Sequence, residues 1–189
     1  MVGFMRRFDS QFAEARAYVA ERGAEVTSIV VESRDPVPAC EDMAFVLANS
    51  CSHDLDMVNW LFPRARALTV DSAAVTDAGV SGLTIKLTVD TGNSSSNVSA
   101  EIRYAKCHPT YLQLVHVHCG ADDVRTFGYD HTPAGSGVPF CALYEDAYKR
   151  QFAAFVDLAA GRVDRSDDLL HSYARTFDAM DAAIAGLAI

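Results

Sequence analysis

Residues 83–104 read LTIKLTVDTGNSSSNVSAEIRY, and the alternation in this stretch decides the fold class. Apolar side chains occupy every second position on both sides of a turn: Leu83, Ile85, Leu87 and Val89 before it, and Val98, Ala100, Ile102 and Tyr104 after it. Polar residues fill most of the intervening positions, and a serine-rich turn at 91–96 separates the two halves. A period of two predicts a β-hairpin with one buried and one solvated face.

Further strands are expected around this hairpin. Short apolar or β-branched runs predict them at residues 26–31, 68–75 and 111–119. The last run is apolar on both faces, so we expect it to lie centrally in the sheet.

Helices are expected before, between and after these strands in the sequence. The apolar spacing predicts one from Asp9 or Ser10 to Gly23, one over residues 44–62, and two in the last third, separated at Gly161. This order predicts an α+β fold, with a mostly antiparallel open sheet and helices packed on one face. Residues 1–189 are expected to form a single domain.

The composition excludes several classes of protein. The 189 residues are 50% hydrophobic and carry 16 basic and 25 acidic side chains, a formal net charge of -9. No apolar run reaches the roughly 18–20 residues that span a bilayer, so no membrane role is expected. The acidic balance argues against a nucleic-acid partner, which requires a basic surface. Irregularly spaced cysteines and the lack of a signal peptide at Met1 predict reduced thiols and a cytoplasmic location.

Sites for nucleotides or metals are not evident in the sequence. Neither G-x-G-x-x-G nor G-x-x-x-x-G-K-[ST] occurs, so we expect the chain to bind no cofactor by itself. His116 and His118 share one face of a predicted strand at a spacing that can hold zinc. A third ligand is not evident, so we interpret both as hydrogen-bonded strand histidines and predict no metal.

Residues 49–61, NSCSHDLDMVNWL, place a dense polar cluster inside an apolar helix. Asn49 and His53 lie four apart and share a helical face, which Asp56 and Trp60 continue. A histidine that titrates near neutrality on such a face can act as a general base. From the residues alone, a catalytic site and a capping or core network are equally compatible with this pattern.

A family resemblance favours the site. Three stretches together resemble the Gfo/Idh/MocA oxidoreductases, and within them the inositol 2-dehydrogenases: VGFMRRFD at 2–9, SRDP at 33–36, and residues 49–61. A fourth match, Ala147-Tyr148 with Phe155-Val156-Asp157, resembles a tyrosine-bearing helix late in those enzymes. The order and spacing of these stretches agree over nearly the whole chain.

The resemblance implies the substrate-binding and oligomerisation domain of a two-domain enzyme, without the N-terminal Rossmann domain that binds NAD(P). It implies that His53 acts as acid and base, with Asn49 orienting the substrate hydroxyl. It also implies that Arg6, Tyr148 and Tyr111 contact a polyol. Two positions depart from the family: Asn49 replaces an aspartate, and Ser33 replaces a substrate-contacting histidine. Asparagine cannot carry the charge that would support an imidazolium on His53.

Two functions remain open on this basis. The chain is either the substrate-binding half of an NAD(P)-dependent polyol or sugar dehydrogenase, or a non-catalytic binding or assembly module descended from one. The expected partners are a polyol or sugar ligand, a separate Rossmann subunit that supplies NAD(P), and further copies of the chain, joined through an apolar sheet face. We expect the isolated chain to bind no NAD(H), to leave myo-inositol unoxidised, and to form at least a dimer.

Overall fold

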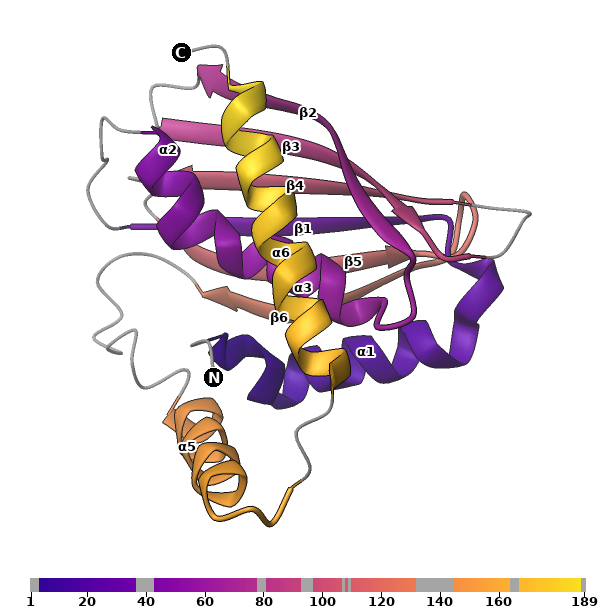
Figure 1. Ribbon diagram of the computed structural model, residues 1–189. Coiled ribbons are helices and arrows are strands. Elements are labelled where there is room, and N and C mark those ends of the chain that lie inside the picture. The colour runs from indigo at the N-terminus through magenta and orange to yellow at the C-terminus, as the bar shows by residue number, and fades with distance from the viewer. Residues whose placement is uncertain are drawn as a thin grey trace.

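The computed structural model describes residues 4–36, 43–77, 81–92, 97–106, 108, 110–131, 145–163 and 167–187 (Figure 1). The strands are β1 (Ser28–Asp35), β2 (Ala67–Asp77), β3 (Ser81–Asp90), β4 (Val98–Lys106), β5 (Tyr111–His118) and β6 (Val124–His131). They form one six-stranded sheet in the order β2-β3-β4-β1-β5-β6. The strand β1 runs parallel to β4, and every other neighbouring pair is antiparallel.

The predicted hairpin is confirmed as β3 and β4. Its register pairs Val89 with Val98 and Ile85 with Ile102, so the apolar positions of both strands share one face. The side chains on that face are buried, and together with those of β1 and β5 they form the sheet side of the core. The strands of this hairpin are neighbours in the sequence. By contrast, β1 lies beside β4 although the two strands are far apart in the chain.

The N-terminal half supplies part of the helical side of the core. A 3₁₀ turn (Met5–Phe8) leads into α1 (Ser10–Arg22), where Asp9 caps the helix by accepting a hydrogen bond of 2.8 Å from the Gln11 amide. The helix ends at Gly23, whose φ of 44° lies in the left-handed region, and a 3₁₀ turn (Gly23–Glu25) follows. The predicted helix over residues 44–62 consists of α2 (Met43–Val46), a π-helical turn (Leu47–Cys51) and α3 (Ser52–Leu61).

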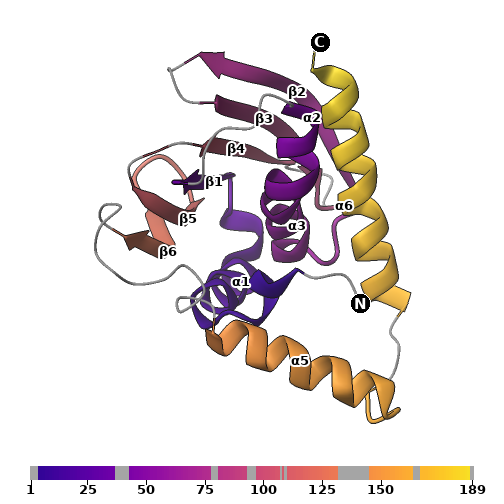
Figure 2. The same ribbon diagram turned by 90° about the vertical axis from the view of Figure 1, so that its left-hand side faces the viewer.

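Two helices close the chain. Helix α6 (Asp167–Gly186) packs on α3 and β2, whereas α5 (Glu145–Ala159) lies beyond α1 and contacts the 3₁₀ turn near the N-terminus. Figure 2 shows α1, α3 and α6 on one side of the sheet and leaves the other side open. The predicted α+β fold with helices on one face is therefore confirmed, with α5 standing apart from the sheet.

Strand β5 lies in the interior of the sheet, as predicted, with β1 and β6 as its neighbours, while β1 and β4 form the centre. Two features differ from the expectations. Strand β6 was not predicted from the sequence. The open face is mostly polar rather than apolar, because the alternation that buries one side of each strand presents threonines and charged pairs such as Glu32–Arg34 and Glu101–Arg103 on the other.

Two features relate to the remaining sequence-based expectations. Cys51 is buried and Cys119 is partly buried, and both thiols are free; Cys40, Cys107, Cys141 and the turn at 93–96 lie outside the described residues. Every helix within the described ranges is too short or too polar to cross a membrane.

Candidate functional site

One pocket brings together all five residues that the sequence analysis selected. It has a volume of about 220 Å³ and lies where β1 and β4 end, beside the π-helical turn. Its walls come from segments far apart in the chain, and the lining residues are Met5, Arg6, Ser33, Arg34, Asp35, Asn49, Ser50, His53, Tyr104, Tyr111, Gln113 and Tyr148. The structure thus places His53, Asn49, Arg6, Tyr111 and Tyr148 around a single space, although it does not assign their roles.

The π-helical turn presents Asn49 and Ser50 to this pocket. The Ser52 amide donates to the Leu47 carbonyl, five residues back, so the turn is wider than in an α-helix. Asparagine and serine have weak helix propensity because their side chains compete for backbone hydrogen bonds, which favours such an irregularity here. Asn49 and His53 still face the same pocket, as their spacing predicts.

The expected continuation of this face to Asp56 and Trp60 is wrong. Both side chains are buried elsewhere: Asp56 is bound by Arg7, and Trp60 packs under the Arg16 guanidinium, 4.8 Å from the ring centre. Both positions belong to α3, which is buried on nearly all sides, and there they meet Arg7 and Arg16 instead of the pocket. The polar cluster seen in the sequence therefore contains two kinds of residue: Asn49 and His53 line the pocket, whereas Asp56 belongs to a structural network.

Arg6 is held at the pocket by a buried carboxylate. Its Nη1 donates to Oδ1 of Asp54, and Ser33 Oγ donates to the same oxygen at 2.7 Å. All three side chains are buried, and Asp54 is fully buried. The other oxygen, Asp54 Oδ2, is buried with no hydrogen-bond partner among the described residues. Ser33, at the position where the family resemblance implies a histidine, thus contributes to fixing the carboxylate that orients Arg6.

His53 is neutral at physiological pH. Burial, assisted by the positive charge of Arg6, lowers the pKa of His53 to about 4. Its Nδ1 is buried and has no hydrogen-bond partner in the described part of the chain. The expectation that this histidine titrates near neutrality is therefore wrong, because the imidazolium would lie in a poorly solvated site beside a guanidinium.

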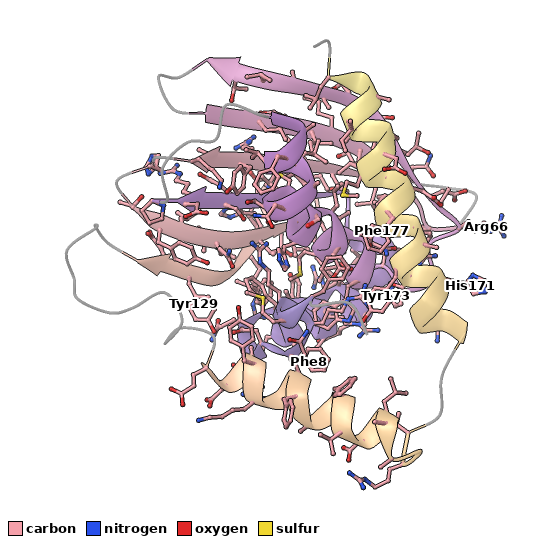
Figure 3. The ribbon with its side chains drawn as sticks, turned by 60° about the vertical axis from the view of Figure 1, so that its left-hand side comes forward. Phe8, Arg66, Tyr129, His171, Tyr173 and Phe177 are labelled. Atoms are coloured by element: carbon pink, nitrogen blue, oxygen red, sulfur yellow. The ribbon has the colours of Figure 1, made fainter. Side chains whose placement is uncertain are left out.

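An aromatic cluster supports the buried side of His53. The Phe4 ring meets the imidazole edge to face at 5.6 Å between centroids, and it also packs against Tyr173 and Phe177. The latter two project from α6 toward the N-terminal turn (Figure 3). Apolar rings in this position deprive the imidazole of water, which is the physical source of its low pKa.

Several pocket residues were not predicted as functional. Tyr104 is buried, contacts Asp35 through a 3.3 Å hydrogen bond and is hydrogen-bonded to Ser50, and burial raises its pKa so that the phenol stays protonated. Gln113 is buried on the inward face of β5, between apolar neighbours. A polar side chain at an inward strand position was the signal that could have identified Gln113. Nothing comparable marked Tyr104, since tyrosine is common in buried strands.

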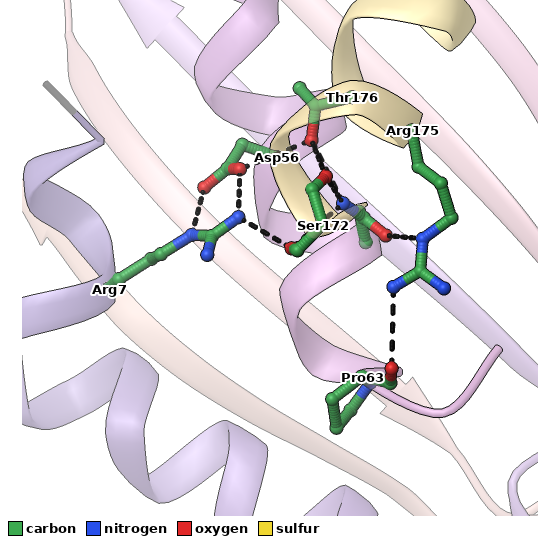
Figure 4. Close-up of polar contacts among 7 residues, drawn as sticks. Arg7, Asp56, Pro63, Ser172, Arg175 and Thr176 are labelled. Atoms are coloured by element: carbon green, nitrogen blue, oxygen red, sulfur yellow. Dashed lines mark hydrogen bonds and ion pairs between the residues drawn. The ribbon is translucent and has the colours of Figure 1, made fainter. Parts of the chain in front are cut away.

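A second polar network ties the N-terminal turn to α3 and α6 (Figure 4). Arg7 Nε donates to Asp56 Oδ2 at 2.8 Å, and its Nη2 donates to Ser172 Oγ at 2.9 Å. Asn59 Nδ2 donates to Thr176 Oγ1 at 3.0 Å, and Asn59 Oδ1 accepts from Arg175. None of these residues lines the pocket, so we infer that the network stabilises the fold. It holds in place the N-terminal turn that carries Arg6.

The strand histidine His116 contacts polar side chains of the neighbouring strands. His116 Nδ1 lies 2.9 Å from Thr126 Oγ1 across the β5–β6 pair, and Glu32 lies 4.0 Å from its Nε2. Groups of three or more histidine, cysteine or acidic residues that could hold a metal do not occur among the described residues. The interpretation of His116 as a hydrogen-bonded strand residue agrees with this geometry.

Comparison with known proteins identifies the fold. No family model matches the sequence, and no curated protein sequence matches it. Among solved structures, myo-inositol dehydrogenase from Corynebacterium glutamicum is similar with a TM-score of 0.66 and 22% identity, over 99% of this chain and 63% of that one. Myo-inositol dehydrogenase from Lactobacillus casei, in complex with NAD(H) and myo-inositol, gives 0.68 and 16%, over 99% and 58%. Scyllo-inositol dehydrogenase from the same organism, with NAD(H) and scyllo-inositol bound, gives 0.64 and 15%, over 96% and 62%.

The six-stranded sheet with helices on one face defines a fold class: the chain has the α+β fold of the C-terminal domain of the Gfo/Idh/MocA dehydrogenases. Within that class, the structures that it resembles are inositol dehydrogenases, so the resemblance expected from the sequence is confirmed at the level of the fold. The chain spans about 60% of the length of these structures.

Proposed function

We propose that this chain is the substrate-binding half of an NAD(P)-dependent polyol or sugar dehydrogenase of the inositol 2-dehydrogenase type. The observation that carries the proposal is the convergence of Arg6, Asn49, His53, Tyr111 and Tyr148 on one pocket. These residues come from the N-terminal turn, the π-turn and α3, β5, and α5. Solved neighbours with the same fold have NAD(H) and an inositol bound, which supports a polyol ligand here.

The pocket suits a small polar ligand. Its volume of about 220 Å³ is below the roughly 300–1,000 Å³ of sites for drug-sized ligands, so a sugar ring fits and a dinucleotide does not. We therefore propose that a nucleotide-binding domain or subunit outside the described residues holds NAD(P), which accepts a hydride from the carbinol carbon when bound. The residues described here bind and orient the polyol.

Each lining residue has a distinct task in this proposal. Arg6, fixed by Asp54, donates hydrogen bonds to substrate hydroxyls, and the phenols of Tyr111 and Tyr148 add further polar contacts. The neutral imidazole of His53 accepts the proton of the hydroxyl that becomes a carbonyl, and Asn49 orients that hydroxyl. Loss of the proton to His53 and of the hydride to NAD(P) balances the oxidation of the alcohol to a ketone.

A second function is favoured by the electrostatics of the same pocket. The low pKa of His53, about 4, makes its protonated form costly, and Asn49 supplies no negative charge to offset that cost. A pocket of this kind binds a polyol more readily than it deprotonates one. The alternative is therefore a non-catalytic module that binds a polyol or sugar and retains the fold of an enzyme domain.

Ligand binding tests both functions. We expect isothermal titration calorimetry to show binding of myo-inositol to the chain, weakened at least about fivefold by Tyr148→Phe, which removes one hydrogen bond. The matched control is Phe152→Ala on the same helix, where an exposed ring lies outside the pocket. Equal affinity of wild type and Tyr148→Phe would contradict the placement of the ligand.

Turnover separates the two functions. We expect the chain alone to bind no NAD(H) and to leave myo-inositol unoxidised, and we expect activity only after a partner nucleotide-binding domain is added. Micromolar binding of NAD(H) by the chain alone would overturn the proposed division of labour. The coding sequence immediately upstream offers a rapid check: a Rossmann domain with a Glu-Lys-Pro motif there favours the enzyme, and its absence favours the module.

A further inference from the structure

A second and larger pocket lies at the other end of the central strands. Its volume is about 550 Å³, within the range of small-molecule sites. Residues where β1 and β4 begin line this pocket, whereas residues where those strands end line the candidate functional site. The walls come from the C-terminal end of α1, which rises toward the sheet in Figure 1, and from the segment after α3.

The floor of this pocket is apolar. Buried side chains from α1, from the end of α3 and the residue after it, and from the starts of β1 and β4 or just before them form it: Val19, Leu61, Phe62, Val26 and Val98. Ala20 and Ala24 add small side chains at the rim, so the space remains open. An apolar ligand body would therefore be removed from water against these residues, which is favourable in proportion to the buried area.

The charged residues of the pocket are all cationic. Arg16 and Arg64 line it, and no aspartate or glutamate is among its lining residues within the described chain. Complementarity therefore favours an anionic ligand over a cationic or neutral one.

The guanidinium of Arg16 has N–H groups available for a hydrogen-bond acceptor on a ligand. The guanidinium carbon lies over the Trp60 ring, 4.8 Å from the ring centre, and the side chain makes no hydrogen bond or ion pair with any described residue. By contrast, Arg6, Arg7 and Arg175 each donate to a carboxylate, hydroxyl, amide or carbonyl oxygen. Burial lowers the pKa of Arg16, and the nearby charge of Arg7 adds to this effect. Stacking on Trp60 restricts the guanidinium while leaving its donors available.

We propose that this pocket binds a small organic anion, with an apolar body against Val26, Leu61 and Val98 and an acidic head group on Arg16. The head group accepts a bidentate hydrogen bond from the guanidinium, as carboxylates commonly do. Arg64, which also lines the pocket, adds a second positive charge. This site is separate from the polyol pocket and does not depend on the function proposed for that pocket.

The single tryptophan of the chain provides the readout. Because Arg16 covers Trp60, we expect octanoate to change the tryptophan fluorescence saturably. Two partial probes separate charge from apolar contact: 1-octanol carries the apolar body alone, and sulfate carries charge alone. We expect both to bind at least about tenfold more weakly than octanoate, since a charge-assisted hydrogen bond and apolar burial act together only in octanoate.

Variants localise the binding. Arg16→Met retains an apolar stem over Trp60 and should weaken octanoate about tenfold or more while leaving 1-octanol unchanged. The matched control, Arg162→Met, removes an exposed arginine outside the pocket and should change neither affinity. Ala20→Phe fills the pocket from an exposed position of α1 and should abolish binding of octanoate. Equal affinity for octanoate and 1-octanol, equal effects of Arg16→Met and Arg162→Met, or undiminished binding in Ala20→Phe would each overturn the proposal.

Discussion

Ser33 Oγ donates a hydrogen bond of 2.7 Å to Asp54 Oδ1. The same oxygen accepts from Arg6, so a strand residue, a helix residue and the N-terminal turn meet at one buried carboxylate. This triad sets the position of Arg6 at the pocket wall. Ser33, at the position where the family resemblance implies a histidine, satisfies one oxygen of this carboxylate together with Arg6.

Asp54 is expected to be far more important for stability than Ser33. Asp54→Asn removes the negative charge and leaves Arg6 as an uncompensated buried cation, so we expect the free energy of unfolding to fall by about 3–5 kcal/mol. Ser33→Ala removes one hydrogen bond from an ion pair that persists, and we expect a loss of about 1 kcal/mol. Urea denaturation measures both values. Similar losses for the two variants would show that the Arg6–Asp54 ion pair stabilises the fold no more than the single Ser33 hydrogen bond does.

The pKa of His53 predicts a pH-dependent stability. The ordinary pKa of 6.5 applies in the unfolded chain, and the folded value is about 4, so the unfolded state binds the proton more tightly. The protein should therefore lose stability as the pH falls from about 6.5 to about 4, by at most about 3 kcal/mol from this group. Above pH 7 the imidazole is neutral in both states and contributes no pH dependence.

Comparison with a variant that does not titrate isolates this contribution. We expect His53→Gln to lack this part of the acid destabilisation, so the difference in unfolding free energy between wild type and variant should change between pH 7 and pH 4. Carboxylates titrate in both proteins and cancel in the difference. A difference that stays constant over this range would mean that His53 is solvated in the folded state.

Asn49→Asp is expected to raise the pKa of His53. Both side chains line the same pocket, and a carboxylate near an imidazole favours its protonated form. Since Asn49 is exposed, solvent weakens the effect, and we expect a rise of up to about one pKa unit. Titration of the imidazole carbon-bound protons by NMR measures the shift. Asn49→Ala is the control and should leave the pKa near the wild-type value; an equal pKa in the aspartate variant would place Asn49 too far away to support proton transfer.

The hairpin and the first helix could be predicted because their signals are local. Alternation defines β3 and β4, and Asp9 and Gly23 mark the ends of α1. Strand β6 has no such signal, since Gly128 interrupts it. The structure explains this glycine: its φ is 114°, and a Cβ there would lie 2.1 Å from the Gln113 carbonyl oxygen. A residue that breaks the pattern is required by the close approach of the neighbouring strand.

The electrostatics of the site could not be predicted in this way. The pKa of His53 depends on Arg6 and Phe4, which lie nearly fifty positions earlier and reach the imidazole only through tertiary packing. Likewise, the sequence placed Asp54 and Asp56 within one polar cluster, whereas folding directs them to two different arginines. The family resemblance predicted five residues that line the pocket. The contacts of these residues and the low pKa of His53 could be found only from the structure.

Assembly through the open sheet face remains a prediction, and its physical basis differs from the apolar contact expected at first. Val30 lies near the middle of this face, with Glu101 and His116 as its neighbours in register on the adjoining strands. In a two-fold dimer each copy presents the same patch, so charged pairs such as Glu101–Arg103 can complement their counterparts. We expect light scattering at micromolar concentration to give at least a dimer.

Two variants decide which surface carries the contact. Val30→Lys places a cation beside Glu101, which the fold tolerates, but it brings two like charges together across a two-fold interface, so we expect monomers. Helix α5 offers a competing surface, because Phe152 and Phe155 are 68% and 48% exposed. Phe152→Glu would disrupt an interface built on that helix and should leave a dimer formed by the sheet intact. A monomeric wild type would contradict the prediction. If Phe152→Glu is a monomer and Val30→Lys a dimer, the interface lies on α5 and not on the sheet.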